Sequence, residues 1–342
     1  MAAKTYYHRI DVAKFLLAFF VVAAHTLPLT PGLRRDYVLN YIFHMTVPFY
    51  FMAMGFLLVS GSRETSLESV QSRLRKNIRH ILQMYLVWTL IYLPITVQGF
   101  SSWGMGFSDA VSEFINQVVC IGENNNSWPL WFLLSSFYGL ILIYIELTFF
   151  HWKHTGLYLT AIGCLGLCLF TNFGHHAAPG SFAGYLFQSA GLDSVLLNGR
   201  IFLSPFYITL GMAFAEHREE LFRISRWKLT GFCALMCVLN ILILDYNHPS
   251  DFNLFLPFGS VFLFAACVVP YEKPCRICSF LRKSSTVIYL THMIWFVLFT
   301  WLFLGDLGCR RRIAFLAACA GSLLTSLLLL LDKKGRISRY LL

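Results

Sequence analysis

Apolar segments long enough to cross a lipid bilayer recur along almost the whole chain. A helix that crosses the hydrocarbon core needs about 20 mainly apolar residues, because lipid offers the backbone no hydrogen bonds. Of the 342 residues, 57% are hydrophobic and only 13% are charged, whereas soluble domains have roughly 25% charged residues. The sequence therefore predicts an all-α, polytopic membrane protein with about ten transmembrane helices. The expected helices are at about 12–29, 40–59, 79–98, 130–150, 156–173, 198–216, 229–245, 253–270, 285–304 and 312–331.

Basic residues are concentrated in every second connection between these segments. Lysine and arginine are retained on the cytoplasmic side of membranes, so an even number of spans places both termini in the cytoplasm. The cluster at 310–312 does not follow this rule. We expect the first apolar segment to be retained rather than cleaved as a signal peptide, and residues 1–342 to form one membrane domain.

The net charge of +10 does not indicate a nucleic-acid-binding protein, because the basic residues lie mostly in short connections rather than in a stripe with spaced aromatic residues. Six of the ten cysteines lie in apolar segments, where cysteine behaves as a small apolar residue. Cys275 and Cys278 form a Cys-x-x-Cys motif in a basic connection. Without a second ligand pair or a thioredoxin-like context, the motif predicts no metal or redox site.

The first apolar segment carries Asp11, Lys14 and His25. Ionisable groups inside a membrane are costly and are candidate functional groups by default. Lys14 and His25 are eleven residues apart, so they share one helix face about 16 Å apart along the axis. Small residues between them, Ala18 and Val21 or Val22, are expected to leave a groove. Alternatively, Lys14 reaches the lipid headgroups and His25 hydrogen-bonds within the bundle.

Two further histidines lie within expected spans. His44 is expected at the same depth as His25, because each lies near the outer end of its span. His292 is expected about 10–12 Å from the inner end of the ninth span. The nearby stretch from Pro48 to Gly55 either shapes a site or serves helix packing.

A dense basic cluster at 73–80 includes Arg75, Lys76 and Arg79. It is an orientation signal, and it is also suited to a phosphorylated ligand because arginine matches phosphate oxygens. Trp131 begins the fourth span, where tryptophan is normally an interfacial anchor. The long connection at about 99–128 is expected to form a lid or a re-entrant segment.

Taken together, six segments in this order resemble the acyltransferase-3 family of bacterial integral-membrane acyltransferases. They are residues 10–15 leading to His25, 47–56, 76–79, 129–133, 199–211 and 288–292. The chain departs from the family at Lys14 and Lys76, where the family usually has arginine, and at Met54, where it usually has serine. Lysine keeps the charge but loses the planar fork of the guanidinium.

The resemblance implies transfer of an acyl group, usually acetyl, from cytoplasmic acyl-CoA to a hydroxyl of a cell-envelope glycan or lipid-linked sugar at a bacterial inner membrane. Acetyl-CoA would be a co-substrate, and no permanently bound cofactor is expected. His25 would act as general base or become transiently acylated, with the pantetheine arm along the first helix. The residues expected to bind the CoA phosphates are Lys14, Arg75, Lys76 and Arg79. Those expected to help bind the acceptor are His44, Trp131 and His292.

Two other functions fit some of the same residues. A transporter of a small polar solute, such as an amino acid, also uses intramembrane lysine and histidine. Some membrane domains that resemble this family are attached to amino-acid racemases, and the absence of such a domain after residue 342 favours acyl transfer. A catalytically idle scaffold is the third hypothesis, because of the lysines at positions 14 and 76.

Overall fold

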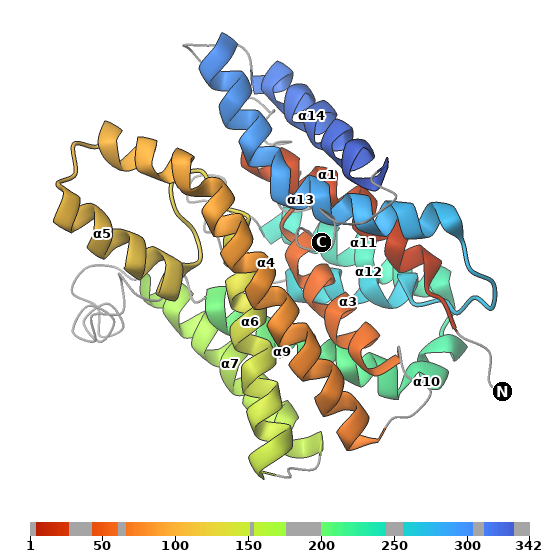
Figure 1. Cartoon of the computed structure of the whole chain (residues 1–342). Helices are drawn as coiled ribbons and strands as arrows, with labels where there is room; N and C mark the ends of the chain where they lie inside the picture. The colour runs from red at the N-terminus through yellow and green to blue at the C-terminus, as the bar shows by residue number, and fades with distance from the viewer. Residues whose placement is uncertain are drawn as a thin grey trace. The chain divides into compact units, whose positions relative to one another are not determined.

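The computed structural model describes residues 5–26, 43–60, 66–150, 154–175, 200–243, 256–303 and 311–331 (Figure 1). Nearly all of these residues lie in helices. In this part of the chain there is no β-strand, and the one isolated bridge joins Tyr6 and Tyr271. The all-α prediction is confirmed for the described residues.

The described helices follow one another in this order along the chain. They are α1 (His8–Thr26), α3 (Thr46–Ser60), α4 (Leu67–Ser102), α5 (Phe107–Asn116), η1 (Gln117–Ile121), α6 (Leu130–Ile145), η2 (Glu146–Phe150), α7 (His154–His175), α9 (Arg200–Glu216), α10 (Arg218–Arg223), α11 (Arg226–Ile243), α12 (Leu256–Cys267), α13 (Arg276–Phe303) and α14 (Arg311–Leu331). Each of the ten predicted apolar segments coincides with one of these helices.

Four described helices are long and apolar enough to cross a membrane. They are Leu67–Ser102, Leu130–Phe149, Arg276–Leu302 and Arg312–Leu329. Large apolar side chains on α4, such as Leu86, Leu90 and Val97, are exposed, as expected for a surface that lipid covers. The chain is thus a helical membrane protein, while the count of ten spans and the cytoplasmic position of both termini stay predictions.

Helix α4 begins twelve residues before the apolar segment that predicted it, at Leu67 rather than at 79. The hydroxyl of Ser66 accepts a hydrogen bond from the backbone N–H of Ser69 at 3.4 Å, and Glu68 lies in the first turn. Both features stabilise a helix start. Hydropathy detects only the part of a helix that lies in lipid, so it missed the polar first turns, which carry the basic cluster.

The contacts within the chain group it into two compact units. Unit 1 comprises Met1–Tyr50, His217–Pro249 and Asn253–Leu342, and unit 2 comprises Phe51–Glu216 and Ser250–Phe252. The boundary falls inside α3, after Tyr50. The prediction of a single membrane domain stays a prediction.

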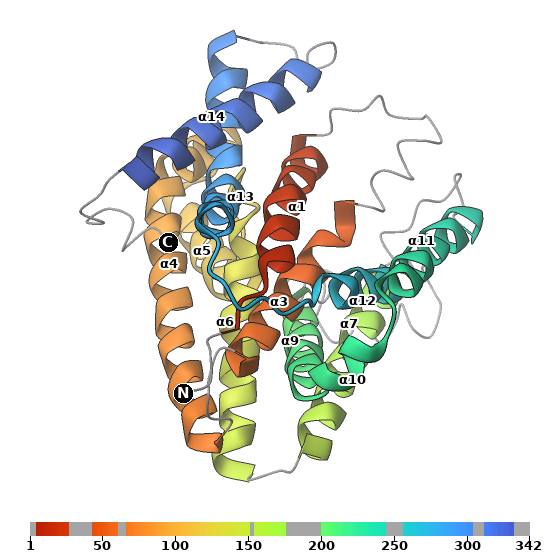
Figure 2. The same ribbon diagram turned by 90° about the vertical axis from the view of Figure 1, so that its right-hand side faces the viewer.

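Unit 1 is built around α1 and α13, which pack against each other, with α14 packed along α13 and α11 against α12. Figures 1 and 2 show α13 and α14, in blue, side by side. Ala18 and Val22 of α1 are fully buried against Ile288 of α13 and Ala318 of α14. Small side chains at these positions let the helices approach closely, which is how helices associate in lipid.

In unit 2, neighbouring helices pack in the order α4, α6, α9 and α7. Helices α3 and α9 approach most closely at two glycines. A Cβ atom on Gly55 would collide with the backbone of Ile208, and one on Gly211 would collide with the backbone of Met52. The glycine of the stretch from Pro48 to Gly55 therefore serves helix packing.

We expect Gly55→Ala and Gly211→Ala each to destabilise the protein by about 1–3 kcal/mol, because the obstructing atoms are backbone and cannot rotate away. The measurement is the thermal unfolding midpoint of purified protein in nanodiscs. Gly163→Ala in α7 is the matched control, since nothing lies near that Cβ position; alanine there should be neutral or stabilising. Equal midpoints for all three variants would contradict the close approach of α3 and α9.

Candidate active site

Helix α1 is continuous from His8 to Thr26, so it carries both Lys14 and His25 as predicted. The side chains of both are half-buried. The prediction of a groove between them is wrong at Ala18 and Val22, because both side chains are completely buried against α13 and α14. The pantetheine arm of a donor therefore cannot lie over these two residues.

His25 is paired with His292 of α13. The two imidazole rings are stacked, with centroids 5.3 Å apart and planes 29° apart. Both residues belong to unit 1. The sequence placed the two histidines in different predicted spans, and the structure brings them together.

His292 is completely buried, and only one of its ring nitrogens has a hydrogen-bond partner among the described residues. Its Nδ1 lies 3.1 Å from the carbonyl oxygen of Ile288. A carbonyl only accepts hydrogen bonds, so Nδ1 carries the proton, and Nε2 of the neutral ring carries a lone pair. A buried acceptor without a hydrogen-bond partner lowers the free energy of unfolding by about 1–3 kcal/mol. Such a group is a strong candidate for a contact with substrate.

Aromatic rings connect this histidine pair to Lys14. The ring of Tyr289 lies 6.3 Å from that of His292, and the ring of Tyr50 lies 6.0 Å from that of Tyr289. The Tyr50 hydroxyl donates a hydrogen bond of 2.5 Å to the carbonyl of Lys14, and the Lys14 ammonium lies 5.4 Å from the centre of the Tyr50 ring. This cation–π contact keeps Lys14 beside the protein rather than extended into the headgroups.

A second cation, which sequence reasoning missed, lies at the same end of this helix pair. Arg282 of α13 lies 3.8 Å from the carboxylate of Asp11, which is largely buried, whereas about half of the arginine side chain is exposed. Arg282 precedes His292 by ten residues, much as Lys14 precedes His25 by eleven. The matching spacing is the signal that could have identified it.

Helices α1 and α13 are therefore parallel, with cations near their starts and histidines about 15–16 Å further along. The Asp11–Arg282 contact near the helix starts and the His25–His292 contact further along both helices establish this direction. The arrangement places a proton-accepting pair at one level of the bundle and positive charge at another.

The basic cluster on α4 of unit 2 divides into two parts. Arg73 is structural: its guanidinium donates to the carbonyl oxygens of Ser69 and Val59, at 3.2 and 3.4 Å. Arg75, Lys76 and Arg79 are exposed, and they share one helix face because they are three and four residues apart. These three residues are free to bind an anion.

The remaining candidates lie elsewhere in each unit. His44 of unit 1 is exposed, and the ring of its neighbour Phe43 packs 5.5 Å from that of Phe20 of α1. Trp131 of unit 2 is half-buried near the start of α6, with its ring 6.5 Å from that of Phe51. Their predicted roles in acceptor binding stay predictions.

A known protein family matches nearly the whole chain. A model described as an acyltransferase domain matches residues 7–331. The chain belongs to the acyltransferase-3 family. The family match covers both units and includes α1, α4 and α13, which carry the histidine pair and the exposed basic cluster.

Curated relatives resemble this acyltransferase-3 protein over part of their own length. It is 29% identical to a serine/alanine racemase of Enterococcus gallinarum over 306 residues, which are 83% of this chain and 40% of that protein. It is 26% identical to an amino-acid racemase of Enterococcus faecalis over 248 residues, 71% of this chain and 33% of that protein. The chain thus matches well under half the length of each relative. No solved structure matches it.

We expect His292→Phe to raise the thermal unfolding midpoint while abolishing acyl transfer. Phenylalanine fills a similar space and removes the unpartnered Nε2, so the gain should be about 1 kcal/mol after the lost Nδ1 hydrogen bond is subtracted. His217→Phe, at an exposed position of unit 1, is the matched control and should change the midpoint by less than about 0.5 kcal/mol. A large loss of stability in His292→Phe would show that Nε2 has a stabilising partner.

Proposed function

We propose that this protein transfers an acetyl group from cytoplasmic acetyl-CoA to a hydroxyl group of a cell-envelope glycan or lipid-linked sugar, in a bacterial inner membrane. The observation that carries the proposal is the His25–His292 pair, in which the completely buried His292 presents an unpartnered acceptor nitrogen. Membership of the acyltransferase-3 family supports the reaction class.

In this proposal His25 acts as the general base. Its imidazole takes the proton from the acceptor hydroxyl, and the hydroxyl oxygen attacks the thioester carbonyl carbon. The carbon–sulfur bond then breaks, and the CoA thiolate leaves with a proton returned by the imidazole. An imidazole suits both steps because its ordinary pKa lies near neutral pH. In the alternative route, His25 itself is acylated first and then passes the acyl group to the hydroxyl.

His292 is assigned a positioning role in the same reaction. Its Nε2 is an acceptor, because Nδ1 donates to Ile288, so it can accept a hydrogen bond from a second hydroxyl of the acceptor sugar while His25 removes the proton of the reacting one. The stacked rings hold both histidines at one level of the bundle. Donor phosphates are assigned to the exposed Arg75, Lys76 and Arg79, and Lys14 and Arg282 add positive charge at the starts of α1 and α13.

The central experiment uses purified protein in nanodiscs with acetyl-CoA labelled in the acetyl group and an added mixture of cell-envelope glycans. Wild type should move label to the glycan, to water or to the protein. His25→Ala should lower this rate about a hundredfold or more, the usual contribution of a general base. His217→Ala is the matched control and should transfer label like the wild type. If His25→Ala removed the label from acetyl-CoA at the wild-type rate, His25 would take no part in the reaction.

The assignment of the donor phosphates has its own test. Arg75→Ala and Arg79→Ala should each raise the KM for acetyl-CoA about tenfold or more with little change in kcat, because each removes a charge-assisted hydrogen bond of roughly 1.5–3 kcal/mol. For acetylpantetheine, which lacks the nucleotide phosphates, the same variants should show unchanged KM values. Arg223→Ala, at an exposed position of α10, is the control. Equal effects on both donors would contradict phosphate binding by α4.

Transport of an amino acid is the second candidate function, because Lys14 and the His25–His292 pair are ionisable groups within apolar helices, as in solute pathways. A transporter would take labelled L-serine or L-alanine into protein-containing vesicles without acyl-CoA. An acyltransferase would not. Uptake together with no loss of label from acetyl-CoA would replace the enzyme proposal with transport.

A further inference from the structure

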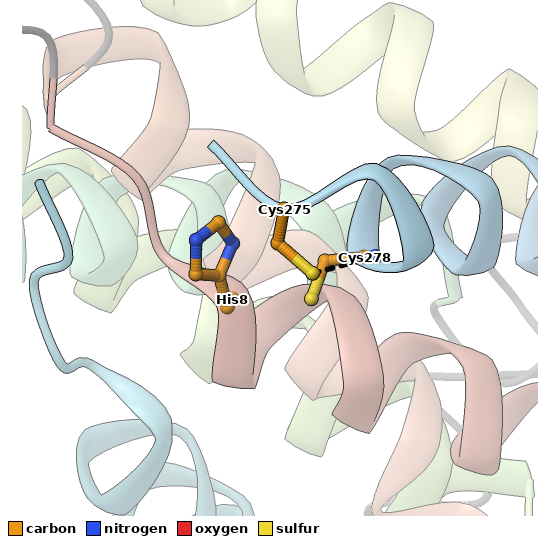
Figure 3. Close-up of side chains that lie close together, drawn as sticks. All are labelled: His8, Cys275 and Cys278. Atoms are coloured by element: carbon orange, nitrogen blue, oxygen red, sulfur yellow. Dashed lines mark hydrogen bonds between the residues drawn. The ribbon is translucent and has the colours of Figure 1, made fainter. Parts of the chain in front are cut away.

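Three side chains with metal-ligand chemistry meet at the starts of α1 and α13, away from the histidine pair. Figure 3 shows His8 beside Cys275 and Cys278. One potential ligand atom from each residue lies within 4.8 Å of the other two. His8 and Cys275 are half-buried, whereas Cys278 is buried. The sequence predicted no metal site here because it offered no further ligand for the cysteine pair, and the fold supplies His8.

Backbone pairing fixes the position of His8 relative to the cysteines. Tyr6 and Tyr271 exchange two backbone hydrogen bonds of 2.8 Å. This bridge holds the segment before α1 against the segment before α13. The His8 ring packs on Tyr271, with centroids 4.8 Å apart. His8 is therefore held in place by contacts that do not involve either sulfur.

The hydrogen bond of His8 selects the tautomer that a metal ligand needs. Its Nε2 lies 2.7 Å from the carbonyl oxygen of Lys273, which only accepts, so Nε2 carries the proton. Nδ1 of the neutral ring then carries the lone pair. Metal-binding histidines commonly donate the second ring nitrogen to a carbonyl in this way, which orients the ring.

The cysteines have the local geometry of a chelating pair. The backbone N–H of Cys278 lies 3.2 Å from the sulfur of Cys275, drawn as the dashed line in Figure 3. In tetrahedral zinc sites, bonds of 2.0–2.3 Å place ligand atoms about 3.5–3.8 Å apart. Starting from 4.8 Å or less, the ligand atoms need to approach one another by at most about 1.0–1.3 Å. Side-chain rotation at a helix start can supply this movement.

We propose that His8, Cys275 and Cys278 bind one thiophilic divalent cation of the zinc type. Two thiolates and one imidazole are the donor set that Zn²⁺ favours over Mg²⁺ or Ca²⁺. Binding forms two metal–sulfur bonds and one metal–nitrogen bond, and the two thiol protons pass to solvent. A water molecule takes the fourth position. The ion joins the start of α1 to the start of α13, and this inference is independent of the acyl-transfer proposal.

The experiment uses the full chain in nanodiscs, reduced with a phosphine and freed of metal with a chelator. Co²⁺ is the probe, because its thiolate complexes absorb in the near ultraviolet and visible. Wild type should bind one equivalent with these bands, and Zn²⁺ should displace it. Cys275→Ser and Cys278→Ser should each weaken binding at least a hundredfold, and His8→Gln about tenfold or more. Cys120→Ser in η1 and His217→Gln are matched controls that should bind like wild type.

A stability measurement separates a metal site from a merely structural cluster. Zn²⁺ should raise the thermal midpoint of the wild type and of Cys120→Ser, but not that of Cys275→Ser, whose half-exposed position tolerates serine. Folding of each variant is checked by its elution from a size-exclusion column. The proposal is overturned if the reduced wild type shows no thiolate–cobalt bands. It is also overturned if the two cysteines stay joined in a disulfide despite the phosphine and bind no metal. Unchanged bands in Cys275→Ser would overturn it equally.

Discussion

The close packing of α1 against α13 is the contact on which the arrangement of unit 1 depends. In lipid, helices gain little from excluding water, so association relies on van der Waals contact between small or well-fitted residues. Ala18 and Val22 supply that contact against Ile288, with Ala318 of α14 completing the cluster. Because the two helices run in parallel, residues at matching distances from their starts become neighbours.

Three groups of polar contacts follow from this parallel packing. At the start of the helices His8 meets the two cysteines, and one turn later Asp11 meets Arg282. Further along, fourteen residues after Asp11 and ten after Arg282, His25 meets His292. Each is a polar contact that an isolated helix could not satisfy, and polar groups in an apolar environment are costly without partners. The exception is Nε2 of His292, which is buried without a hydrogen-bond partner among the described residues and therefore lowers the stability of the fold. Ser284 of α13 also has a buried hydroxyl without a hydrogen-bond partner among the described residues. A hydroxyl is far less basic than an imidazole, so we propose that the chemistry takes place at the histidine pair.

In unit 2, the basic residues at the start of α4 divide into one that packs against the protein and three that stay exposed. Of the basic residues at the start of α4, Arg73 turns back onto the carbonyl of Val59 at the end of α3, whereas Arg75, Lys76 and Arg79 stay exposed. The glycines of α3 and α9 allow the backbones to meet directly, and this contact fixes α3 within the unit. Neighbouring residues of the same type thus have different roles because they point to different sides of one helix.

The sequence alone determined the helical class and the family, because hydropathy and residue spacing are local properties that survive in any arrangement of the chain. It also identified Lys14, His25 and the exposed part of the basic cluster, since ionisable residues in apolar segments stand out. Tertiary structure decided which of these residues meet: His25 with His292, Asp11 with Arg282, and His8 with a cysteine pair far away in the chain. It also filled the expected groove over Ala18 and Val22. These outcomes depend on which helices pack together and in which direction, and local sequence patterns do not contain that information.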